Sequence, residues 1–353
     1  MINYRQANET DYVRINDFHN RIYVSDRTIE QFYWEFHNGP DGPSIYIIAE
    51  DGDKVVGTNC VIPLKVVLPS GETLLTGKSE DTLVDPDYRG QNIFYDIYQV
   101  LFEASLEQGI AVIWGFTSAS KPFRKLGFEI PYSHSQSLTV NRYFASYNYL
   151  SKLNPANKLI DKLKIAGLCG LSRFKALTAG SASGLSDYRI TENEPVTEVS
   201  GLLSAVTEGS NLYYIQQSPG FQQWRIYENP NYFKVHTFAF YDREQVLKGL
   251  IVLNAHPDGM AYVNQTLFHP SVDDRKRRAM IRYMTKQVFR SGISLIRNWH
   301  FTHTPPNLEE IRNYKNAGYV FLEKGVGFVW KPLNTELDPA DFYLSRLATQ
   351  GVI

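Results

Sequence analysis

The stretch Leu83–Phe94, LVDPDYRGQNIF, constrains the fold of this chain more than any other. It starts as the apolar end of a predicted strand, passes through Asp85-Pro86 and a short basic loop with Gly90, and continues into a helix whose apolar residues recur at helical spacing. Such a loop presents backbone N–H groups at a helix N-terminus. Together with Arg89 it predicts a site for phosphate groups within a mixed α/β fold.

Two neighbouring carboxylates, Glu80 and Asp81, precede this loop on the same predicted strand. Because successive side chains of a strand point to opposite faces, at most one of them faces a cleft. A carboxylate placed there can take the proton that an ammonium group must lose before it attacks. We prefer Glu80 and keep Asp81 as the second candidate; the alternative for either is a salt-bridged strand residue. His134, further along the chain, is a weaker candidate.

Composition excludes several classes of protein. The chain has 353 residues, enough for two domains, and 43% of them are hydrophobic, as in folded soluble proteins. The net charge of −1 gives no global signal for a nucleic-acid partner. The two cysteines, Cys60 and Cys169, predict neither a disulfide framework nor a metal site. No segment approaches the roughly 20 apolar residues of a membrane-spanning helix, and we expect a cytoplasmic protein.

The second half of the chain repeats short patterns of the first half in the same order. Five matches in order predict an internal duplication. The matched segments are Trp34–Pro40 with Trp224–Pro230, Val56-Gly57 with Lys248-Gly249, Thr82–Pro86 with Thr266–Pro270, Trp114–Phe116 with Trp299–Phe301, and Phe123–Phe128 with Tyr314–Tyr319.

This repetition predicts four parts: a first domain at 1–143, a basic helical linker at 144–185, a second domain at 186–335 and a tail at 336–353. The linker carries six lysine and arginine residues against the single acid Asp161. One interpretation is a solvated linking helix. The other is a basic amphipathic face at 150–175 that contacts a membrane surface or another anionic partner.

The first domain resembles the GNAT acetyltransferase superfamily. The resemblance rests on Val84–Gln91, on the helix that follows, and on Phe123–Phe128. It covers about residues 1–143 and reaches about 186–332 only through the repeat. It implies two domains, each a twisted mixed sheet flanked by helices, with acetyl-coenzyme A as the donor and an amine as the acceptor. Tandem members with one working and one degenerate domain are known in that superfamily.

The phosphate loop of the family maps onto Arg89, Gly90, Gln91, Asn92, Ile93 and Phe94. Two of its small positions differ here. Asn92 is a mild change, because asparagine adopts positive φ more readily than other residues with a side chain. Phe94 is a larger change, and its ring would have to turn into the core beside Ile97 and Tyr98 to leave the loop free.

The resemblance also implies roles for residues around the loop. Leu83 and Val84 would position the pantetheine arm and the thioester, and Ser118 and Ser120 would meet its amides. The tyrosine that often protonates the departing thiolate in this family is replaced by Phe123. In the second domain, Asp273 and Asp274 occupy the corresponding loop without a glycine, so that we expect no cofactor there.

These observations predict an N-acyltransferase that moves an acetyl group from acetyl-coenzyme A to a small-molecule amine by direct attack. By analogy with tandem relatives, the acceptor is expected to be an amino sugar or a sugar nucleotide. Two alternatives stay open: a two-domain transferase of the related tRNA-dependent type, and a non-catalytic protein that binds coenzyme A or another ligand. The sequence carries no signal for the oligomeric state.

Overall fold

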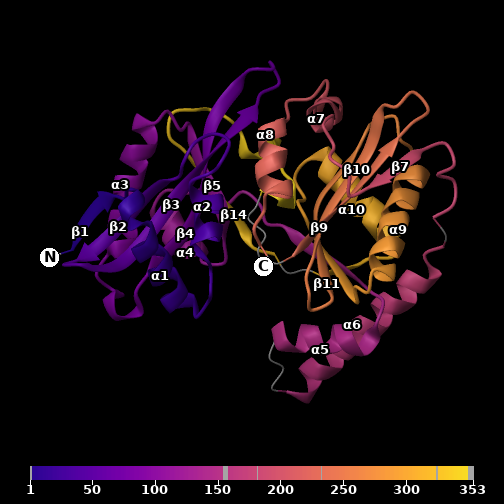
Figure 1. Ribbon diagram of the computed structural model, residues 1–353, viewed down its shortest axis with the longest axis horizontal. Helices are drawn as coiled ribbons and strands as arrows, with labels where there is room; N and C mark the ends of the chain where they lie inside the picture. Colours follow the sequence, from indigo (N-terminus) through magenta and orange to yellow (C-terminus); the bar gives the residue numbers. More distant parts are fainter. Residues whose placement is uncertain (1, 154–157, 181, 232, 323–324, 349–353) are drawn as a thin grey trace. The chain divides into compact units, whose positions relative to one another are not determined.

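The computed structural model describes residues 2–153, 158–180, 182–231, 233–322 and 325–348. The chain divides into two compact units, each built around one sheet (Figure 1). Neither unit is one continuous segment. Unit 1 consists of Met1–Tyr132, Tyr213–Asn231 and Val326–Phe342, and unit 2 of Ser133–Leu212, Tyr232–Gly325 and Tyr343–Ile353.

The sheet that unit 1 contains is mixed. Its strands are ordered β1-β2-β3-β4-β5-β14. The pairs β1–β2, β2–β3 and β3–β4 are antiparallel, whereas β4 and β5 are parallel. Short β8 pairs with β3 and with β15. The strands are β1 (Asn3–Gln6), β2 (Ile45–Asp51), β3 (Lys54–Val67), β4 (Thr73–Val84), β5 (Val112–Thr117), β8 (Tyr213–Ile215), β14 (Gly327–Pro332) and β15 (Phe342–Tyr343).

Helix α3 covers the centre of this sheet because its apolar residues recur at helical spacing. Ile93 and Ile97 are buried against β2 and β3, and a Cβ added to Gly57 would lie 2.8 Å from Ile93, so that glycine allows the close approach. The helices of unit 1 are α1 (Tyr12–Tyr23), α2 (Ile29–Phe36), α3 (Ile93–Glu107), α4 (Ser120–Lys125) and α8 (Pro219–Gln222), with one-turn segments at Glu9–Asp11, Pro86–Tyr88, Gln223–Tyr227 and Pro339–Asp341.

Unit 2 repeats this plan with a seven-stranded sheet in the order β13-β6-β12-β11-β10-β9-β7. Its one parallel pair is β11–β12, the counterpart of β4–β5. The strands are β6 (Ser135–Val140), β7 (Arg189–Glu192), β9 (Lys234–Tyr241), β10 (Leu247–Ala255), β11 (Met260–Phe268), β12 (Leu295–His300) and β13 (Val320–Leu322).

Helix α9 covers the unit 2 sheet as α3 covers the unit 1 sheet, with Met280, Ile281 and Met284 in its core. None of the helices in the described ranges combines the length and the hydrophobicity that a membrane crossing requires. The helices of unit 2 are α5 (Tyr143–Leu153), α6 (Leu159–Thr178), α7 (Val199–Thr207), α9 (Asp274–Arg290) and α10 (Pro305–Asn316), and a single turn follows at Arg346–Ala348.

Two strands, β6 and β14, each join the sheet that is the more distant one in the sequence. Strand β6 follows the first domain in sequence, but it pairs with β12 and β13 in unit 2. Strand β14 follows the second domain, but it pairs with β5 in unit 1. The boundary predicted at residue 143 therefore differs from the boundary at Tyr132, and α5 and α6, predicted as a linker, are part of unit 2. The predicted fold class, mixed sheets flanked by helices, is confirmed.

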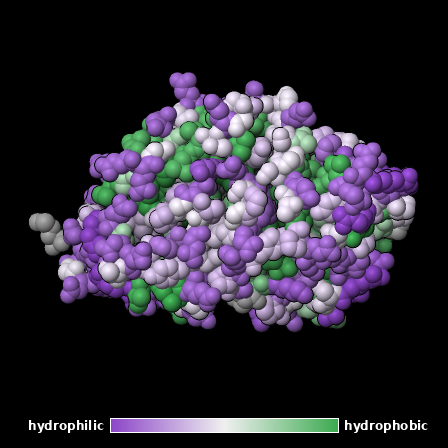
Figure 2. Space-filling view, turned by 45° about the horizontal axis from the view of Figure 1, so that its top comes forward, coloured by the Kyte–Doolittle hydropathy of each residue, from purple (hydrophilic) through white to green (hydrophobic). Residues whose placement is uncertain are grey.

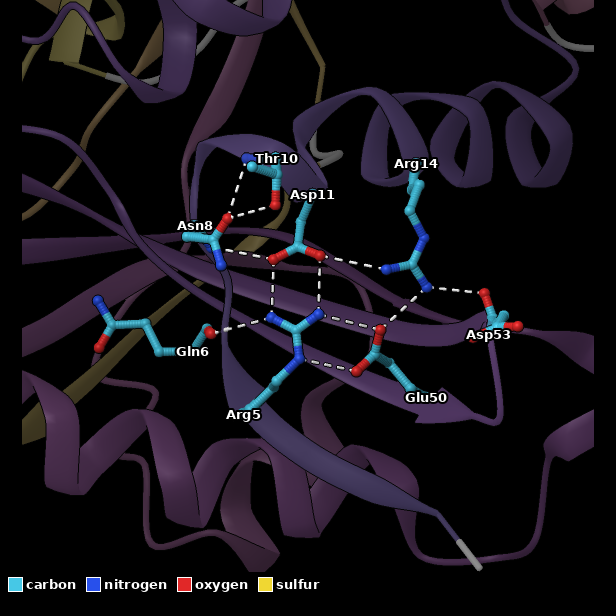
Figure 3. A network of polar contacts seen from close by, with 8 residues as sticks. All are labelled: Arg5, Gln6, Asn8, Thr10, Asp11, Arg14, Glu50 and Asp53. Atoms are coloured by element: carbon cyan, nitrogen blue, oxygen red, sulfur yellow. Dashed lines mark hydrogen bonds and ion pairs between the residues drawn. The ribbon is translucent and has the colours of Figure 1, made fainter.

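A network of ion pairs joins the start of α1 to the edge of the unit 1 sheet (Figure 3). Arg5 on β1 donates two bonds of 2.7 Å to Asp11, and it donates to Glu50 on β2 at 2.8 and 3.1 Å. Arg14 on α1 donates to Asp11 and Glu50 at 3.2 and 2.9 Å and to the Asp53 carbonyl oxygen at 2.7 Å. The Arg5 hydrogen bonds lower the pKa of Asp11, in spite of its burial.

Replacement of Arg5 by methionine is expected to lower the free energy of unfolding by about 2–3 kcal/mol at pH 7, because two largely buried carboxylates then share only Arg14. The pKa of Asp11 is depressed in the folded state, so that its contribution is complete above the unfolded pKa and is lost as the pH falls through the folded pKa. The deficit of Arg5→Met, measured by urea denaturation, should therefore shrink below about pH 4.

The matched control is Arg124→Met, which changes an exposed arginine of α4 in the same unit. Its free energy of unfolding should stay within about 0.5 kcal/mol of the parent protein. Equal effects of the two substitutions would contradict a role for the network in stability.

Candidate active site

The site predicted from the sequence lies where β4 and β5 separate. Their parallel ladder contains the pairs Gly77 with Ile113 and Lys78 with Trp114. Beyond Lys78, β4 continues to Val84 along β3 alone. From Ser79 to Val84, β4 therefore no longer pairs with β5, and the two strands separate before the loop that leads into α3.

The loop at the N-terminus of α3 has the backbone geometry that a phosphate site needs. Gly90 and Asn92 adopt positive φ of 84° and 62°, and the exposed residues Arg89–Asn92 precede the helix. Asn92 caps the helix through its backbone, and within the described structure its side chain makes no capping bond. The start of a helix after an exposed loop of this kind is a position at which backbone N–H groups can bind anions. The left-handed conformation predicted as tolerable for Asn92 is the one it adopts.

Phe94 turns away from the loop. Its ring packs in the core of unit 1, with centroids 5.1 Å from Tyr98 and 5.6 Å from Phe123. This is the orientation that the phosphate loop requires if a bulky residue stands at that position. Phe123 is itself buried against Phe128, at 5.2 Å, so that it closes the core below the loop.

The other residues expected to contact the donor lie at the ends of the two separating strands. Leu83 is buried and Val84 half-buried at the end of β4. Ser118 is exposed just after β5, and Ser120 is half-buried as the first residue of α4. The fold thus brings together the loop, the end of β4 and the start of α4. His134 belongs to unit 2, where its ring stacks on that of Trp299.

Asp81 is a buried anchor within β4. Its carboxylate accepts hydrogen bonds from His19 at 2.7 Å, from Arg27 at 3.2 Å and from the Tyr46 hydroxyl, and its carbonyl oxygen accepts from Thr58. Its backbone has a φ of 50°, at a bulge in the β3–β4 ladder. Burial favours the neutral acid, but the hydrogen bonds outweigh burial and lower the pKa of Asp81. These contacts tie α1 and β2 to the bend of β4.

Glu80 faces a different environment. Its carboxylate accepts a 2.8 Å bond from the Lys78 ammonium group; Lys78 is 2% exposed, whereas the side chain of Glu80 is 31% exposed. The two share a face of β4 because they are two residues apart. Opposite Glu80 on β3 lies Cys60, and burial raises the pKa of its thiol well above the ordinary value, which rules out a ready nucleophile.

A second carboxylate, Glu35 on α2, belongs to the same group, and sequence reasoning missed it. Burial raises the pKa of Glu35 to about 7; the positive charges of Arg27 and Lys78 oppose the rise, and the negative charges of Glu80 and Asp81 add to it. A carboxylate that titrates near neutral pH is suited to proton transfer under ordinary conditions.

Arg225 completes the group from a distant part of the sequence. The indole nitrogens of Trp34 and Trp224 each donate to the other's carbonyl oxygen, at 2.7 and 2.6 Å, and the Arg225 guanidinium lies 5.3 and 5.7 Å from their rings. Burial lowers the pKa of Arg225 to about 10, while Glu35 and Glu80 favour its charged form.

The sequence repeat places Glu35 and Arg225 at equivalent positions, which is the sequence signal for this group. Trp34-Glu35 and Trp224-Arg225 stand at equivalent positions of the duplicated segment, and their charges are opposite. Tyr213–Asn231, which contains Trp224 and Arg225, packs within unit 1 although it follows most of that unit by about 80 residues in the chain.

The corresponding loop of unit 2 differs as expected. Asp273 caps α9 and accepts the Lys276 N–H at 2.9 Å, so that a carboxylate of the protein already occupies the helix N-terminus. Between residues 2–153, 158–180, 182–231, 233–322 and 325–348, no group of three or more His, Cys, Asp or Glu side chains is arranged to hold a metal ion.

Residues 3–130 match the family model for the acetyltransferase (GNAT) domain. No curated protein sequence matches the chain. This segment of the chain contains the separating strands, the loop and both carboxylates of the candidate site, whereas Arg225 lies outside it.

Several solved structures share the fold. A probable N-acyltransferase from Enterococcus faecalis superposes with a TM-score of 0.65 at 8% identity, covering 95% of this chain and 73% of that one. For a GCN5-related N-acetyltransferase from Anabaena variabilis the TM-score is 0.62 at 11% identity, with coverage of 95% and 73%. For a tandem GNAT protein from the clavulanic acid biosynthesis pathway it is 0.56 at 10% identity, with coverage of 94% and 99%.

Residues 3–130 therefore carry a GNAT-type acetyltransferase domain, which confirms the resemblance seen in the sequence of the first domain. The chain as a whole has a fold similar to that of GNAT N-acetyltransferases, including a tandem GNAT protein.

Replacement of Asp81 by asparagine is expected to lower the free energy of unfolding by about 2–4 kcal/mol at pH 7, because Arg27 loses its buried partner. Urea denaturation measures the loss. Asp17→Asn, at an exposed position of α1, is the control and should change stability by less than about 0.5 kcal/mol. An Asp81→Asn protein with unchanged stability would show that the carboxylate is not an anchor.

Proposed function

We propose that unit 1 transfers an acetyl group from acetyl-coenzyme A to the amine of a small molecule by direct attack. The observation that carries this proposal is the group of charges around Glu80 on β4, the strand that leads into the loop before α3. Lys78 holds Glu80 at 2.8 Å, and the charge of Glu80 acts on both Glu35 and Arg225. A cationic amine and an anionic donor thus each find complementary groups.

The residues of the loop fit the diphosphate of the donor. Arg89 supplies an exposed positive charge, and Gly90 and Asn92 adopt the left-handed conformation that occurs in anion-binding turns. Phe94 does not obstruct the loop, because its ring lies in the core. Leu83 and Val84, at the end of β4, would pair with the pantetheine arm through their backbone groups.

The proposed chemistry needs one base and one leaving group. Glu35 takes the proton from the ammonium group of the acceptor, and Glu80, held by Lys78, binds the same ammonium group by charge. The amine nitrogen then bonds to the thioester carbonyl carbon, the carbon–sulfur bond breaks, and coenzyme A leaves as the thiolate. The nitrogen loses its second proton as the amide forms. Because Phe123 cannot donate a proton, water or Ser120 relays that proton to the thiolate. Orientation of the two substrates supplies much of the rate.

The identity of the acceptor stays a prediction. Trp34 and Trp224 are buried against each other, with ring centroids 5.8 Å apart, so that the expected amino sugar or sugar nucleotide rests on the analogy with tandem relatives. The tRNA-dependent alternative does not account for the loop Arg89–Phe94, because transferases of that type lack a phosphate loop. An assay of thioester consumption with a panel of amines separates catalysis from binding alone.

Arg89→Ala is expected to weaken binding of coenzyme A about 10- to 100-fold, because a charged contact contributes roughly 1.5–3 kcal/mol. Isothermal titration calorimetry measures the dissociation constant. Arg275→Ala is the matched control, since Arg275 is an exposed arginine in the corresponding segment of unit 2. Equal losses in the two variants, or no heat with the parent protein at millimolar coenzyme A, would contradict the assignment of the donor site to unit 1.

Glu35→Gln is expected to lower kcat by about 10²- to 10⁴-fold, the usual contribution of a general base. Because the base must be deprotonated, kcat/KM of the parent enzyme should rise with pH through about 7 and then level off. This rise should be absent in the variant. Glu80→Gln should raise KM for the amine more than it lowers kcat.

The control for both carboxylates is Glu30→Gln, which changes an exposed residue of the same helix as Glu35. Its rates and pH profile should match those of the parent enzyme. A Glu35→Gln enzyme that keeps the rise near pH 7 would exclude Glu35 as the base and leave Glu80 as the candidate.

A further inference from the structure

Helix α6 has two apolar faces, and the core of unit 2 covers one of them. Cys169 and Ser172 are fully buried on the inner face, and the Ser172 hydroxyl donates to the carbonyl oxygen of Leu138 on β6. Ile165 and Leu168 are half-buried beside them in the same cluster. Helix α5 packs along α6 (Figure 1).

The opposite side of α6 is also apolar, but it is exposed. At 100° per residue these side chains fall within an arc of about 120° centred away from Cys169, which we call the outer face. An exposed helix face is normally polar, and hydrophilic residues predominate on the surface that Figure 2 shows. The outer face consists of Leu159, Ile160, Leu163, Leu171, Phe174 and Leu177, which are 49–76% exposed.

Basic residues border the outer face on both sides. Lys162 and Arg173 lie along one border and Lys164 and Lys175 along the other, by the same helical geometry. The one acid in α6 is Asp161, and its carboxylate lies 3.5 Å from the Lys164 ammonium group. The outer face is therefore a hydrophobic strip between two rows of positive charge.

We propose that the outer face of α6 docks on the surface of an anionic lipid membrane. The leucines and Phe174 would enter the boundary between headgroups and acyl chains, as the apolar side of an interfacial helix does. The lysine and arginine stems are long enough to lie along this apolar surface while their charges reach lipid phosphates. The proposal concerns unit 2 and does not depend on the activity proposed for unit 1.

The charge pattern favours a membrane over a second copy of the chain. Two outer faces packed together would place the basic borders of one copy against those of the other, and the face offers no acid to compensate them beyond Asp161. A lipid surface supplies negative charge on both sides of the apolar strip at once, whichever way the helix axis points.

The test uses the full-length protein and co-sedimentation with vesicles of phosphatidylcholine, with or without phosphatidylglycerol, at low and high salt. The variant Leu163→Gln with Phe174→Gln should weaken binding to anionic vesicles by about tenfold or more. Leu308→Gln is the matched control, since Leu308 is 52% exposed on α10 of the same unit. Charge reversal at Lys164 and Arg173 should also weaken binding, whereas Lys286→Glu on α9 should not.

We expect binding only to vesicles with anionic lipid, and we expect it to fall as salt rises. Absence of binding, or equal loss in the variant and its control, overturns the proposal. A concentration-dependent dimer that the outer-face variant abolishes, without vesicle binding, would assign the face to a second copy. Binding to polyglutamate but not to vesicles would assign it to an acidic protein. Circular dichroism of each variant confirms that it is folded.

Discussion

The separation of β4 from β5 is the constraint on which the candidate site depends. A ladder of two residue pairs holds the strands together, and glycine at 115 allows the close approach there, since a Cβ would lie 3.1 Å from the Ser79 carbonyl oxygen. Beyond this point the bulge at Asp81 redirects β4. The three side chains that bond the Asp81 carboxylate keep this bend in place.

The same part of the fold gives the carboxylates of Asp81 and Glu35 opposite properties. Asp81 is surrounded by hydrogen-bond donors, and these outweigh the cost of burial, so that it stays charged. Glu35 is buried beside other carboxylates, and its pKa rises to about 7. One group therefore stabilises the strand, and the other is suited to exchange a proton. The difference comes from the neighbours of each carboxylate and not from its chemical type.

The two units share a sheet plan but differ in the strands that complete each sheet and in the loop before the central helix. Each sheet is completed by a strand from beyond its own repeat, β6 in unit 2 and β14 in unit 1, so that neither sheet forms from one continuous segment. The positions occupied by Glu35 and Arg225 are equivalent in the repeat, and in unit 1 they carry opposite charges in one group. In unit 2 the loop before α9 differs, because the Asp273 side chain caps the helix and accepts a hydrogen bond from the Lys276 N–H.

The sequence by itself determined what depends on near neighbours. The helix after Asn92 follows from the helical spacing of its apolar residues, and the left-handed turn at Asn92 follows from the backbone preference of asparagine. The turn of Phe94 into the core was also predictable, because only one direction leaves the loop free.

The tertiary structure alone decided which sheet β6 and β14 join, and which charged residues become buried together. Strand pairing across 161 residues, as between Ser137 and Asn298, leaves no mark on local periodicity. The pKa of Glu35 likewise depends on burial and then on the charges of Arg27, Glu80 and Lys78, which only the folded chain brings near it. Burial and charge act through space, and a linear sequence does not record those distances.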